Sequence, residues 1–592
     1  MTNHPEKIIV ALLAALLLGS CADLSHKPAI VPQAVKSDDF VTMNYQQRSW
    51  VPADEMLFDP IAVGSMAEIP VNHVRSKIIG PSYQDAVNSL AAKIWMIENA
   101  QYTVDLVYYI FKRDTVGYAI LGALCNAVKR GVDVRLMVDS VGSIHTSHKE
   151  LKALETCADK AGYIKDEAGI VTPNKARIQV VIINALSKAF VRINRRSHDK
   201  LIVIDGHVAD KAIIMTGGRN ISVAYYGINE DGSPDPTAYQ DLEIVLRPDM
   251  ETENKELSVG TLTTHYYTLL FLHAGNRRLR PSTWFQWGYQ QEKDKAQEKL
   301  NFVKNIPAIQ TSLAKMPSFL NTGYSNSMVK LVHQLDNLTN ENVVTDALEN
   351  LQQNLNSIHN ISTALITHMV GPVKTLRISS PYYFLARYDD AEGDVVFDTV
   401  KNTYRWLEEN PQSSVEIITN SVLTSDNFSA QAVIDMDTAP QLLLSPELLE
   451  QWLSGLEEGE FNPELVESEA WKKSVNNPRL KIYQTGKLDS VLLGGDQHYG
   501  KLHAKSVVFG DVGYVGTSNF DYRSRLFNNE FGYFFKGDEL AADLKQVFAD
   551  LKAKSYRWGS PEWLEMRKQL MALDTSKASA TRKQRGLFKT LR

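Results

Sequence analysis

The most informative segment of this chain reads Arg195-Arg196-Ser197-His198-Asp199-Lys200-Leu201-Ile202-Val203-Ile204-Asp205-Gly206. Its main features return later as Leu502-His503-Ala504-Lys505-Ser506-Val507-Val508-Phe509-Gly510-Asp511. Each copy has a His and a Lys two residues apart at the start of an apolar run, so on a β-strand both side chains point to one face. A turn of small residues ending in Asn follows each copy: Gly217-Gly218-Arg219-Asn220 and Gly516-Thr517-Ser518-Asn519. An imidazole beside an ammonium suits a phosphate, so the repeat predicts two halves of one phosphate site.

The segments before each copy alternate between strand and helix patterns. Branched and aromatic residues favour strands, and apolar residues at helical spacing favour helices. Strand, helix and strand in this order imply a right-handed crossover and a parallel pair. We therefore expect two pseudo-twofold-related α/β domains. The expected elements are, in the first half, strands 101–111, 132–139 and 178–183 with helix 119–130, and in the second, strands 375–384, 414–420 and 480–483 with helix 395–408.

The same patterns predict the domain boundaries. We expect a signal peptide at 1–20, a tether at 21–70, a first domain at 71–250, a mainly helical insertion at 251–370 with a helix at 343–355, a second domain at 371–560, and a basic tail at 561–592. Within the insertion, residues 277–287 combine cations with aromatics, as a membrane-interface surface would. Ordinary packing around a turn is the alternative and the preferred expectation. The tail is expected either to touch anionic lipid or to be a frayed, solvated end.

Composition and charge limit the class of protein. With 592 residues, 44% apolar and 22% charged, the chain is typical of folded globular proteins. A net charge of −6 gives no overall attraction for nucleic acid, so an anion site must be built from local positive charge. We therefore do not expect nucleic acid as a partner.

The cysteines point to the cell envelope. An apolar run from Ile8 to Leu18 follows Lys7 and leads into Gly19-Ser20-Cys21. This pattern resembles a bacterial lipoprotein signal with Cys21 as the lipidated residue. The Ala that follows Cys21 favours, by the same resemblance, the periplasmic face of the outer membrane. Of the remaining cysteines, Cys125 is expected to be a buried free thiol, although an oxidising compartment also allows a disulfide with Cys157.

A phosphodiester resists cleavage because its negative charge repels a nucleophile and its alkoxide is a poor leaving group. Two histidines on opposite sides of the phosphodiester can overcome both barriers. One neutral imidazole can attack phosphorus and form a phosphohistidine, and the other can protonate the departing oxygen and then activate water or an alcohol. The ammonium groups and the Asn amides would hold the non-bridging oxygens. The residues in question are His198, Lys200 and Asn220 in the first half and His503, Lys505 and Asn519 in the second. This chemistry needs no metal and no other cofactor.

Two glutamates are candidate partners for the histidines. Glu243 and Glu530 each follow their Asn turn and enter an apolar, strand-like run. A carboxylate bonded to the far nitrogen of each imidazole would fix its tautomer and raise its basicity. The chain contains no HExxH, Walker or GxSxG motif that would indicate a competing chemistry.

The paired pattern resembles the phospholipase D superfamily, whose signature is HxKxxxxD followed by a GSxN-like turn, present twice. The resemblance adds Asp205, the motif aspartate, as a catalytic residue, with Gly218 and Ser518 as substrate-binding turn residues. In the second copy Gly510 stands at the aspartate position, and the interval from Lys505 to Asn519 is short. In the first copy residues 207–211 lengthen the hairpin.

Within the superfamily, the segments around Tyr108, His198, Asn220 and Asn519 look most like the bacterial cardiolipin synthase group, particularly its C-type branch. That resemblance implies phosphatidyl transfer, with His198 as nucleophile and His503 as acid and base, although pseudo-symmetry allows the exchange of these roles. Arg195 and Arg196, beside His198, would attract a phospholipid head group or a nucleic-acid backbone.

The expected substrate is a phospholipid of the phosphatidylglycerol or phosphatidylethanolamine type, and the expected location is the membrane, through a lipid anchor. Three alternatives remain. The first is a phospholipase D that releases phosphatidic acid, because water and an alcohol compete for the same intermediate. The second is a lipid-binding envelope protein whose second half-site has decayed at Gly510. The third is a metal-independent nuclease.

Overall fold

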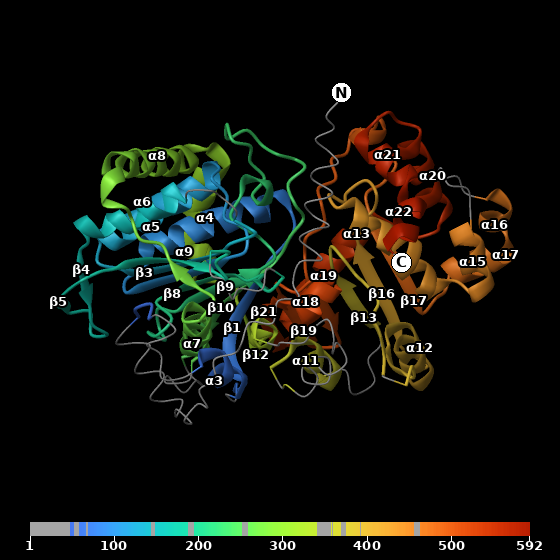
Figure 1. Ribbon diagram of the computed structural model, residues 1–592, viewed down its shortest axis with the longest axis horizontal. Helices are drawn as coiled ribbons and strands as arrows, with labels where there is room; N and C mark the ends of the chain where they lie inside the picture. Colours follow the sequence, from blue (N-terminus) through green and yellow to red (C-terminus); the bar gives the residue numbers. More distant parts are fainter. Residues whose placement is uncertain are drawn as a thin grey trace.

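A computed structural model describes residues 48–51, 59–66, 69–143, 148–187, 194–250, 258–339, 357, 359–368, 375–390, 392–454 and 462–591. In this part of the chain one sheet of sixteen strands runs through the whole molecule, with helices on both faces (Figure 1). The predicted class, two α/β halves related by a pseudo-twofold axis, is confirmed by the order of the strands.

Equivalent strands of the two halves occur in the same spatial order from each edge of the sheet to its middle. The first half contributes β11 (Arg277–Arg278), β6 (Ile178–Ile183), β3 (Asp133–Asp139), β2 (Thr103–Tyr108), β8 (Lys200–Ile204), β9 (Ile213–Gly217), β10 (Glu243–Pro248) and β1 (Asn72–Ile79), in that spatial order. The second half continues from the middle outward with β12 (Ser325–His333), β21 (Phe531–Lys536), β19 (Val512–Gly516), β18 (Ser506–Phe509), β13 (Thr375–Ser379), β16 (Ser414–Thr419), β17 (Leu480–Thr485) and β22 (Ser555–Arg557). The pseudo-axis therefore passes between β1 and β12, which pair antiparallel.

The strands leading to the site are buried on both faces, which explains their continuous apolar sequences. On β2, Val104 and Leu106 belong to the core under α4 (Tyr83–Asn99) and α5 (Thr115–Lys129), whereas Val107 belongs to the opposite core. That opposite core is shared by α7 (Val259–Phe271) of the first half and α19 (Asp538–Ala553) of the second. The two halves therefore share one continuous hydrophobic layer.

The segment between the halves is mainly helical, with α7, α8 (Gln286–Asn305), α9 (Pro307–Phe319) and α11 (Ile361–His368). It also supplies two strands of the sheet, which helical periodicity did not predict. β11 follows α7 as β22 follows α19, and β12 occupies the place in the second half that β1 has in the first. The sheet of the second half thus begins at Ser325 rather than after residue 370. The predicted helix at 343–355 lies outside the described residues.

The C-terminal segment is not the frayed, solvated end that was one of the two expectations for it. Residues 561–591 form α20 (Pro561–Met571), α21 (Ser576–Arg582) and α22 (Gln584–Leu591), which pack on the second half. Arg567 forms a buried ion pair with Asp435, at 2.7 Å between Nη1 and Oδ2, and Phe588 is buried. The expected helix at 395–408 also begins later, because residues 395–398 form strand β15 and α12 covers Thr399–Glu409.

Two further expectations are corrected near the N-terminal half. Cys125 is not a free thiol: it forms a disulfide with Cys157, which joins α5 to the 3₁₀ helix η2 (Thr156–Lys160). The segment assigned to the tether is ordered at Arg48, whose guanidinium is buried and bonded to Asp105 and Asp133 at 2.7 and 2.9 Å. Helix α3 (Pro60–Met66) also precedes β1.

Candidate active site

The two motif segments are each attached by backbone hydrogen bonds to the opposite half. The His198 N–H donates to the carbonyl of Asn529 at 2.9 Å, next to the parallel pairing of β7 (Arg196–Ser197) with β20 (Asn528–Asn529). In the reverse direction, the His503 N–H donates to the carbonyl of Gln240 at 2.8 Å. This reciprocal arrangement brings the two histidine segments to the seam between the halves.

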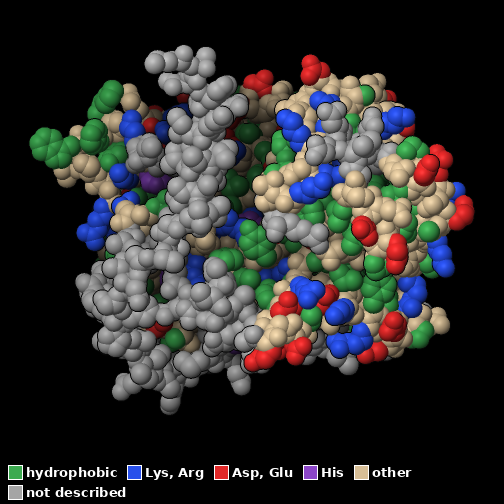
Figure 2. All heavy atoms as spheres, turned by 45° about the vertical axis from the view of Figure 1, so that its right-hand side comes forward, with side chains coloured by type: hydrophobic (Ala, Val, Ile, Leu, Met, Phe, Trp, Pro, Cys, Tyr) green, Lys and Arg blue, Asp and Glu red, His purple; other side chains and the backbone are tan. Residues whose placement is uncertain are grey.

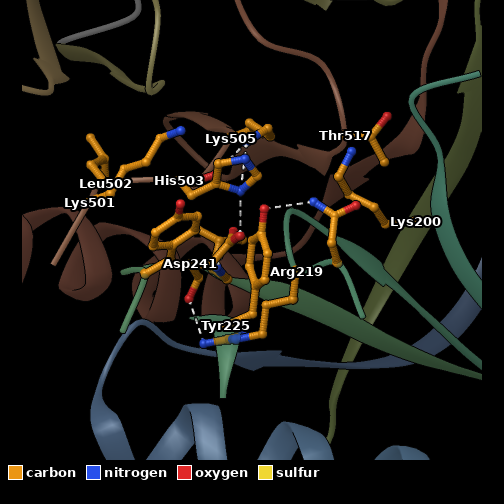
Figure 3. A network of polar contacts seen from close by, with 12 residues as sticks. Lys200, Arg219, Tyr225, Asp241, Lys501, Leu502, His503, Lys505 and Thr517 are labelled. Atoms are coloured by element: carbon orange, nitrogen blue, oxygen red, sulfur yellow. Dashed lines mark hydrogen bonds and ion pairs between the residues drawn. The ribbon is translucent and has the colours of Figure 1, made fainter. Parts of the chain in front are cut away.

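Each imidazole is oriented by a carboxylate of the other half. His198 Nδ1 lies 2.9 Å from Glu530 Oε2. His503 Nδ1 lies 2.7 Å from Asp241 Oδ2, as Figure 3 shows. Glu530 is itself held by hydroxyl donors from Thr517 and Ser524, each at 2.7 Å. Both carboxylates are buried, so these charge-assisted contacts are shielded from water.

Glu243 does not have the role predicted for it. Its carboxylate accepts from Lys93 Nζ at 2.5 Å and pairs with Arg219 Nη1 at 3.2 Å, all within a buried cluster. Arg219 also donates to the carbonyls of Gly80 and Asp241. Glu243 therefore stabilises the first half, and Asp241 is the residue that contacts a histidine.

The strand register explains why Asp241 corresponds to Glu530. In the first half Gly217 on β9 is opposite Glu243, whereas in the second Gly516 on β19 is opposite Gly532. Counting two residues back from each partner reaches Asp241 and Glu530. The loops that connect these strands to their Asn turns differ in length, so spacing from the Asn was misleading. Asp241 directly precedes the apolar Leu242, as Glu530 directly precedes Phe531, but Glu243 likewise precedes the apolar Ile244, so only the strand register separates the two acidic residues.

The two lysines lie beside their histidines in similar positions. Lys200 Nζ donates to the carbonyl of His198 at 2.5 Å, and Lys505 Nζ donates to the carbonyl of His503 at the same distance. Burial lowers the pKa of Lys200 to about 8 and lowers that of Lys505 well below its usual range. A bound phosphate would favour the charged form of both lysines, because an anion nearby stabilises an ammonium.

Both histidines are neutral at neutral pH. Burial lowers the pKa of His198 to about 4 although Glu530 opposes the shift, and burial together with the ammonium of Lys505 lowers the pKa of His503 well below its usual value. With the carboxylate accepting at Nδ1, the proton belongs on Nδ1 and Nε2 carries the free lone pair. Such a nitrogen can act as a nucleophile or a base.

Two tyrosines that the motif did not indicate pack against the imidazoles. Tyr109 meets the His198 ring edge-on with centroids 4.8 Å apart. Tyr225, labelled in Figure 3, meets the His503 ring in the same way at 5.3 Å. Tyr109 directly follows β2, and a residue at the carboxyl end of a strand next to the motif strand was the available signal.

The asparagines of the two turns differ in their hydrogen bonds. Asn220 Oδ1 accepts from the Ile110 N–H at 3.0 Å and its amide donates to Tyr225 Oη at 2.8 Å, so it positions the residues around both rings. Asn519 Oδ1 is buried and has no hydrogen-bond partner among the described residues. Of the two asparagines, Asn519 thus keeps an acceptor that is not used by the protein.

The small turn residues are explained by packing. A Cβ on Gly218 would lie 2.0 Å from Asp241 Oδ1, so glycine is required for the carboxylate to reach His503. Ser518 is buried, and its hydroxyl donates to the carbonyl of Asn519 at 3.1 Å. Gly218 therefore acts through Asp241, whereas the expectation was direct contact with substrate.

The motif aspartate lies at the opposite end of its strand from the histidine. Asp205 accepts from the N–H groups of Gln101, Tyr102 and Thr103 at 2.7–2.9 Å, which fixes the start of β2. In the second half Gly510 and Asp511 alone connect β18 to β19, whereas residues 205–212 connect β8 to β9. The expected catalytic role of Asp205 is therefore corrected to a structural one. The Gly510 irregularity leaves the contacts of His503 intact.

The arginines beside His198 are buried and bonded to protein groups, which corrects the prediction that they receive substrate. Arg195 donates to the carbonyl of Asn337. Arg196 donates to Ser140 Oγ at 2.5 Å and lies 3.6 Å from Asp139. Cys21 lies outside the described residues. Within the described ranges no helix is long and apolar enough to cross a bilayer, and no group of three or more His, Cys, Asp or Glu side chains is placed to hold a metal ion.

Comparison with known proteins agrees with this geometry. Residues 94–231 match the family described as "Cardiolipin synthase, PLD-like domain". Cardiolipin synthase C of Escherichia coli is 30% identical over 158 residues, which are 25% of this chain and 28% of that protein. A cardiolipin synthase of Clostridium perfringens is 36% identical over 146 residues, 24% and 26% of the two chains.

The matched part is thus about a quarter to three tenths of these curated relatives. The structure of phosphatidylserine synthase from Haemophilus influenzae is 14% identical, with a TM-score of 0.48 over 89% of this chain and 95% of that one. The family match, which includes the first motif, confirms the resemblance to the phospholipase D superfamily and to its cardiolipin synthase-like members.

Acid should destabilise the folded protein through its buried histidines. Unfolded histidine titrates near 6.5, whereas burial lowers the pKa of His198 to about 4, so below pH 6.5 the unfolded chain binds a proton that the folded chain does not. The stability present above pH 6.5 is then lost as pH falls toward 4. We expect a His198 contribution of about 2 kcal/mol lost between pH 7.5 and pH 5.

Urea unfolding at these two pH values would measure this loss, and His198→Gln should reduce it by about that amount. An equal loss of stability in the wild-type and His198→Gln proteins would contradict a neutral, buried His198.

Proposed function

Because this chain resembles the phospholipase D superfamily, we propose that it is a phosphatidyltransferase. It transfers the phosphatidyl group of a phospholipid, through a phosphohistidine, to an alcohol such as phosphatidylglycerol, which gives cardiolipin. The observation that carries this proposal is the pair of neutral imidazoles at the seam, each with Nδ1 held by a carboxylate of the other half.

The first step cleaves the donor lipid. His198 Nε2 attacks phosphorus, an N–P bond forms and the P–O bond to the head-group alcohol breaks. His503, protonated once the phosphate anion is bound, gives its proton to the departing oxygen. Lys200 and Lys505 stabilise the charge on the non-bridging oxygens as it redistributes. The products are a phosphatidyl-histidine and the free alcohol.

The second step reverses these roles with a new alcohol. Neutral His503 takes the hydroxyl proton of the acceptor, whose oxygen attacks phosphorus while the N–P bond breaks. Electrons of that bond return to His198 Nε2, and the proton taken by His503 prepares the next cycle. Glu530 and Asp241 keep the proton of each ring on Nδ1 throughout.

A difference between the halves supports this assignment of roles. Beside His503, the Lys501 ammonium bonds Asp426 at 2.7 Å and Tyr382 Oη at 3.1 Å, and the Tyr239 ring lies 5.8 Å from the His503 ring. The Asp426 side chain is 46% exposed. An alcohol can reach His503 along this polar rim, and its hydroxyl groups find both donors and acceptors there.

The corresponding pair beside His198 is closed. Arg196 and Asp139 are both fully buried, so neither offers an exposed polar group to an incoming alcohol, whereas the two histidine side chains are similarly exposed, at 10% for His198 and 8% for His503. The histidine on the side where alcohols leave and enter must carry a proton. The histidine on the other side then forms the covalent bond to phosphorus. This favours His198 as the nucleophile and His503 as the acid and base.

Hydrolysis to phosphatidic acid is the second candidate, because the half-exposed Asp426 admits water as well as an alcohol to the rim. A decayed second half-site is disfavoured by the intact Asp241 and Lys505 contacts of His503. A nuclease is disfavoured by the net charge of −6. We also propose the cell envelope as the location, with lipidation at Cys21 and phospholipid as the membrane substrate.

Product analysis tests the function. The full-length protein in phosphatidylglycerol and phosphatidylethanolamine vesicles with chelator should form cardiolipin, detected by mass spectrometry, and His198→Ala and His503→Ala should abolish it. His498, an exposed histidine in the second half, gives the matched control variant His498→Ala, which should retain activity. Phosphatidic acid as the sole product would show a hydrolase, and product from His198→Ala would contradict the mechanism.

The two acidic residues of the 241–243 segment should respond differently. Asp241→Asn replaces the carboxylate that fixes the His503 tautomer by a neutral amide that can also donate, so turnover should fall by roughly two to four powers of ten with little change in melting temperature. Glu243→Gln weakens a buried ion pair, so stability should fall by about 3–5 kcal/mol while the folded fraction stays active. Thermal unfolding and turnover of both proteins would measure this contrast, and the opposite pattern would restore Glu243 as the histidine partner.

Leaving-group chemistry distinguishes the two histidines. A phosphatidyl ester of p-nitrophenol needs no proton on its leaving group, so His503→Ala should still release p-nitrophenol in a burst of about one equivalent per site. His198→Ala should release none. A burst from His198→Ala but not from His503→Ala would assign the nucleophile to His503 instead.

A further inference from the structure

Three large aromatic side chains project from the N-terminal end of α8. Trp284 is 91% exposed, Phe285 64% and Trp287 77%. They lie on and next to the short 3₁₀ helix η5 (Thr283–Phe285), at the left edge of the molecule in Figure 1. Figure 2 shows large hydrophobic side chains projecting from that same edge. The preferred expectation of ordinary packing is therefore wrong for this segment.

The exposure is specific to this place in the chain. Of the nine tryptophans, Trp452, Trp471, Trp558 and Trp563 are fully buried, and three others are half-buried. Trp284 and Trp287 alone are exposed. Two exposed tryptophans and a phenylalanine within four residues leave a large apolar area in water, which folded proteins use as a binding surface.

The charge next to this aromatic tip, defined as residues 284–287, is positive. The segment 277–291 contains three arginines and no Asp or Glu. Arg277 and Arg280 are exposed, and Arg278 pairs with Glu155 at 3.3 Å. A surface that combines exposed Trp with Arg complements the interface of an anionic bilayer, where the rings lie at head-group depth and the cations meet phosphates.

A groove of about 570 Å³ lies directly behind the tip, between α5, η2 and the start of α8. Three lysines line it, Lys129, Lys160 and Lys293, against two aspartates, Asp159 and Asp294. Burial lowers the pKa of Lys293, and although Asp159 opposes the shift, Lys160 and Lys129 add to it. An anion in the groove would relieve the repulsion among these ammonium groups.

We infer that the aromatic tip and the basic groove bind the surface of a phospholipid bilayer that contains anionic lipid. The two tryptophans and Phe285 enter the interface, and a lipid head-group phosphate occupies the groove. The tip is convex, and a deformable bilayer accepts a convex apolar surface without the matching pocket that a protein partner would need. This binding is separate from turnover, because none of its residues touches His198 or His503.

Vesicle co-sedimentation tests the inference with residues 22–592, which lack both the apolar run 8–18 and Cys21, so that neither contributes to binding, and with His198→Ala, so that turnover is excluded. Binding to phosphatidylcholine vesicles containing phosphatidylglycerol should be roughly tenfold or more weaker for Trp284→Ala/Trp287→Ala. The matched control is Val491→Ala/Leu492→Ala, which removes two exposed hydrophobic side chains from the second half and should bind as the parent does. Circular dichroism of each protein verifies folding.

The contribution of the arginines to vesicle binding is tested separately. Arg277→Ala/Arg280→Ala should remove most of the preference for phosphatidylglycerol over phosphatidylcholine vesicles, and added salt should do the same to the parent. Unchanged binding of the tryptophan variant would overturn the inference. Loss of a concentration-dependent dimer in that variant, seen by gel filtration without any change in vesicle binding, would instead assign the tip to a second copy of this chain. Product formation by the unmodified protein remains a separate measurement, so failure of one proposal does not imply failure of the other.

Discussion

Neither half of this molecule supplies the carboxylate that orients its own histidine. The carboxylate that fixes the tautomer of His198 belongs to Glu530 in the second half, and the one that fixes His503 belongs to Asp241 in the first. Both contacts require the halves to be held in one relative position, because a hydrogen bond to a ring nitrogen tolerates only small changes in distance and angle. The antiparallel pairing of β1 with β12 and the shared core under α7 and α19 provide that position.

Much of the fold could be predicted, because the strands leading to the site are buried on both faces and therefore consist of apolar runs. The pairing of the two halves followed from the repeat of the His and Lys motif. The place of β12 could not be predicted in this way, because its alternate residues are half-exposed and it lies in a segment of mostly helical periodicity. Its assignment depends on contacts with β1 and β21, which are far away in the sequence.

For the site, too, some residues could be predicted from local spacing in the sequence, whereas others depend on contacts between distant segments. His198, Lys200, His503 and Lys505 share local spacing and could be found from it. Asp241 could not be distinguished from Glu243, since both are acidic and two residues apart, and only the register opposite β9 separates them. Arg195 and Arg196 were assigned to substrate from charge alone, whereas burial and internal partners gave them structural positions. The motif aspartate and the turn glycine both act at a distance from phosphorus, Asp205 on the start of β2 and Gly218 on the carboxylate of Asp241.

The continuous sheet also limits how the site can exclude water. Enzymes that close two domains around a substrate need a hinge, and sixteen strands joined edge to edge, with a core that spans the join, leave no hinge between the halves in the described part of the chain. Access to the histidines can therefore change through side chains at the rim, such as Asp426 and Lys501, but not through domain closure. For the proposed transfer, the choice between water and an alcohol would then be a kinetic competition. Its outcome would depend on how many acceptor molecules the surrounding lipid delivers during the lifetime of the proposed covalent intermediate.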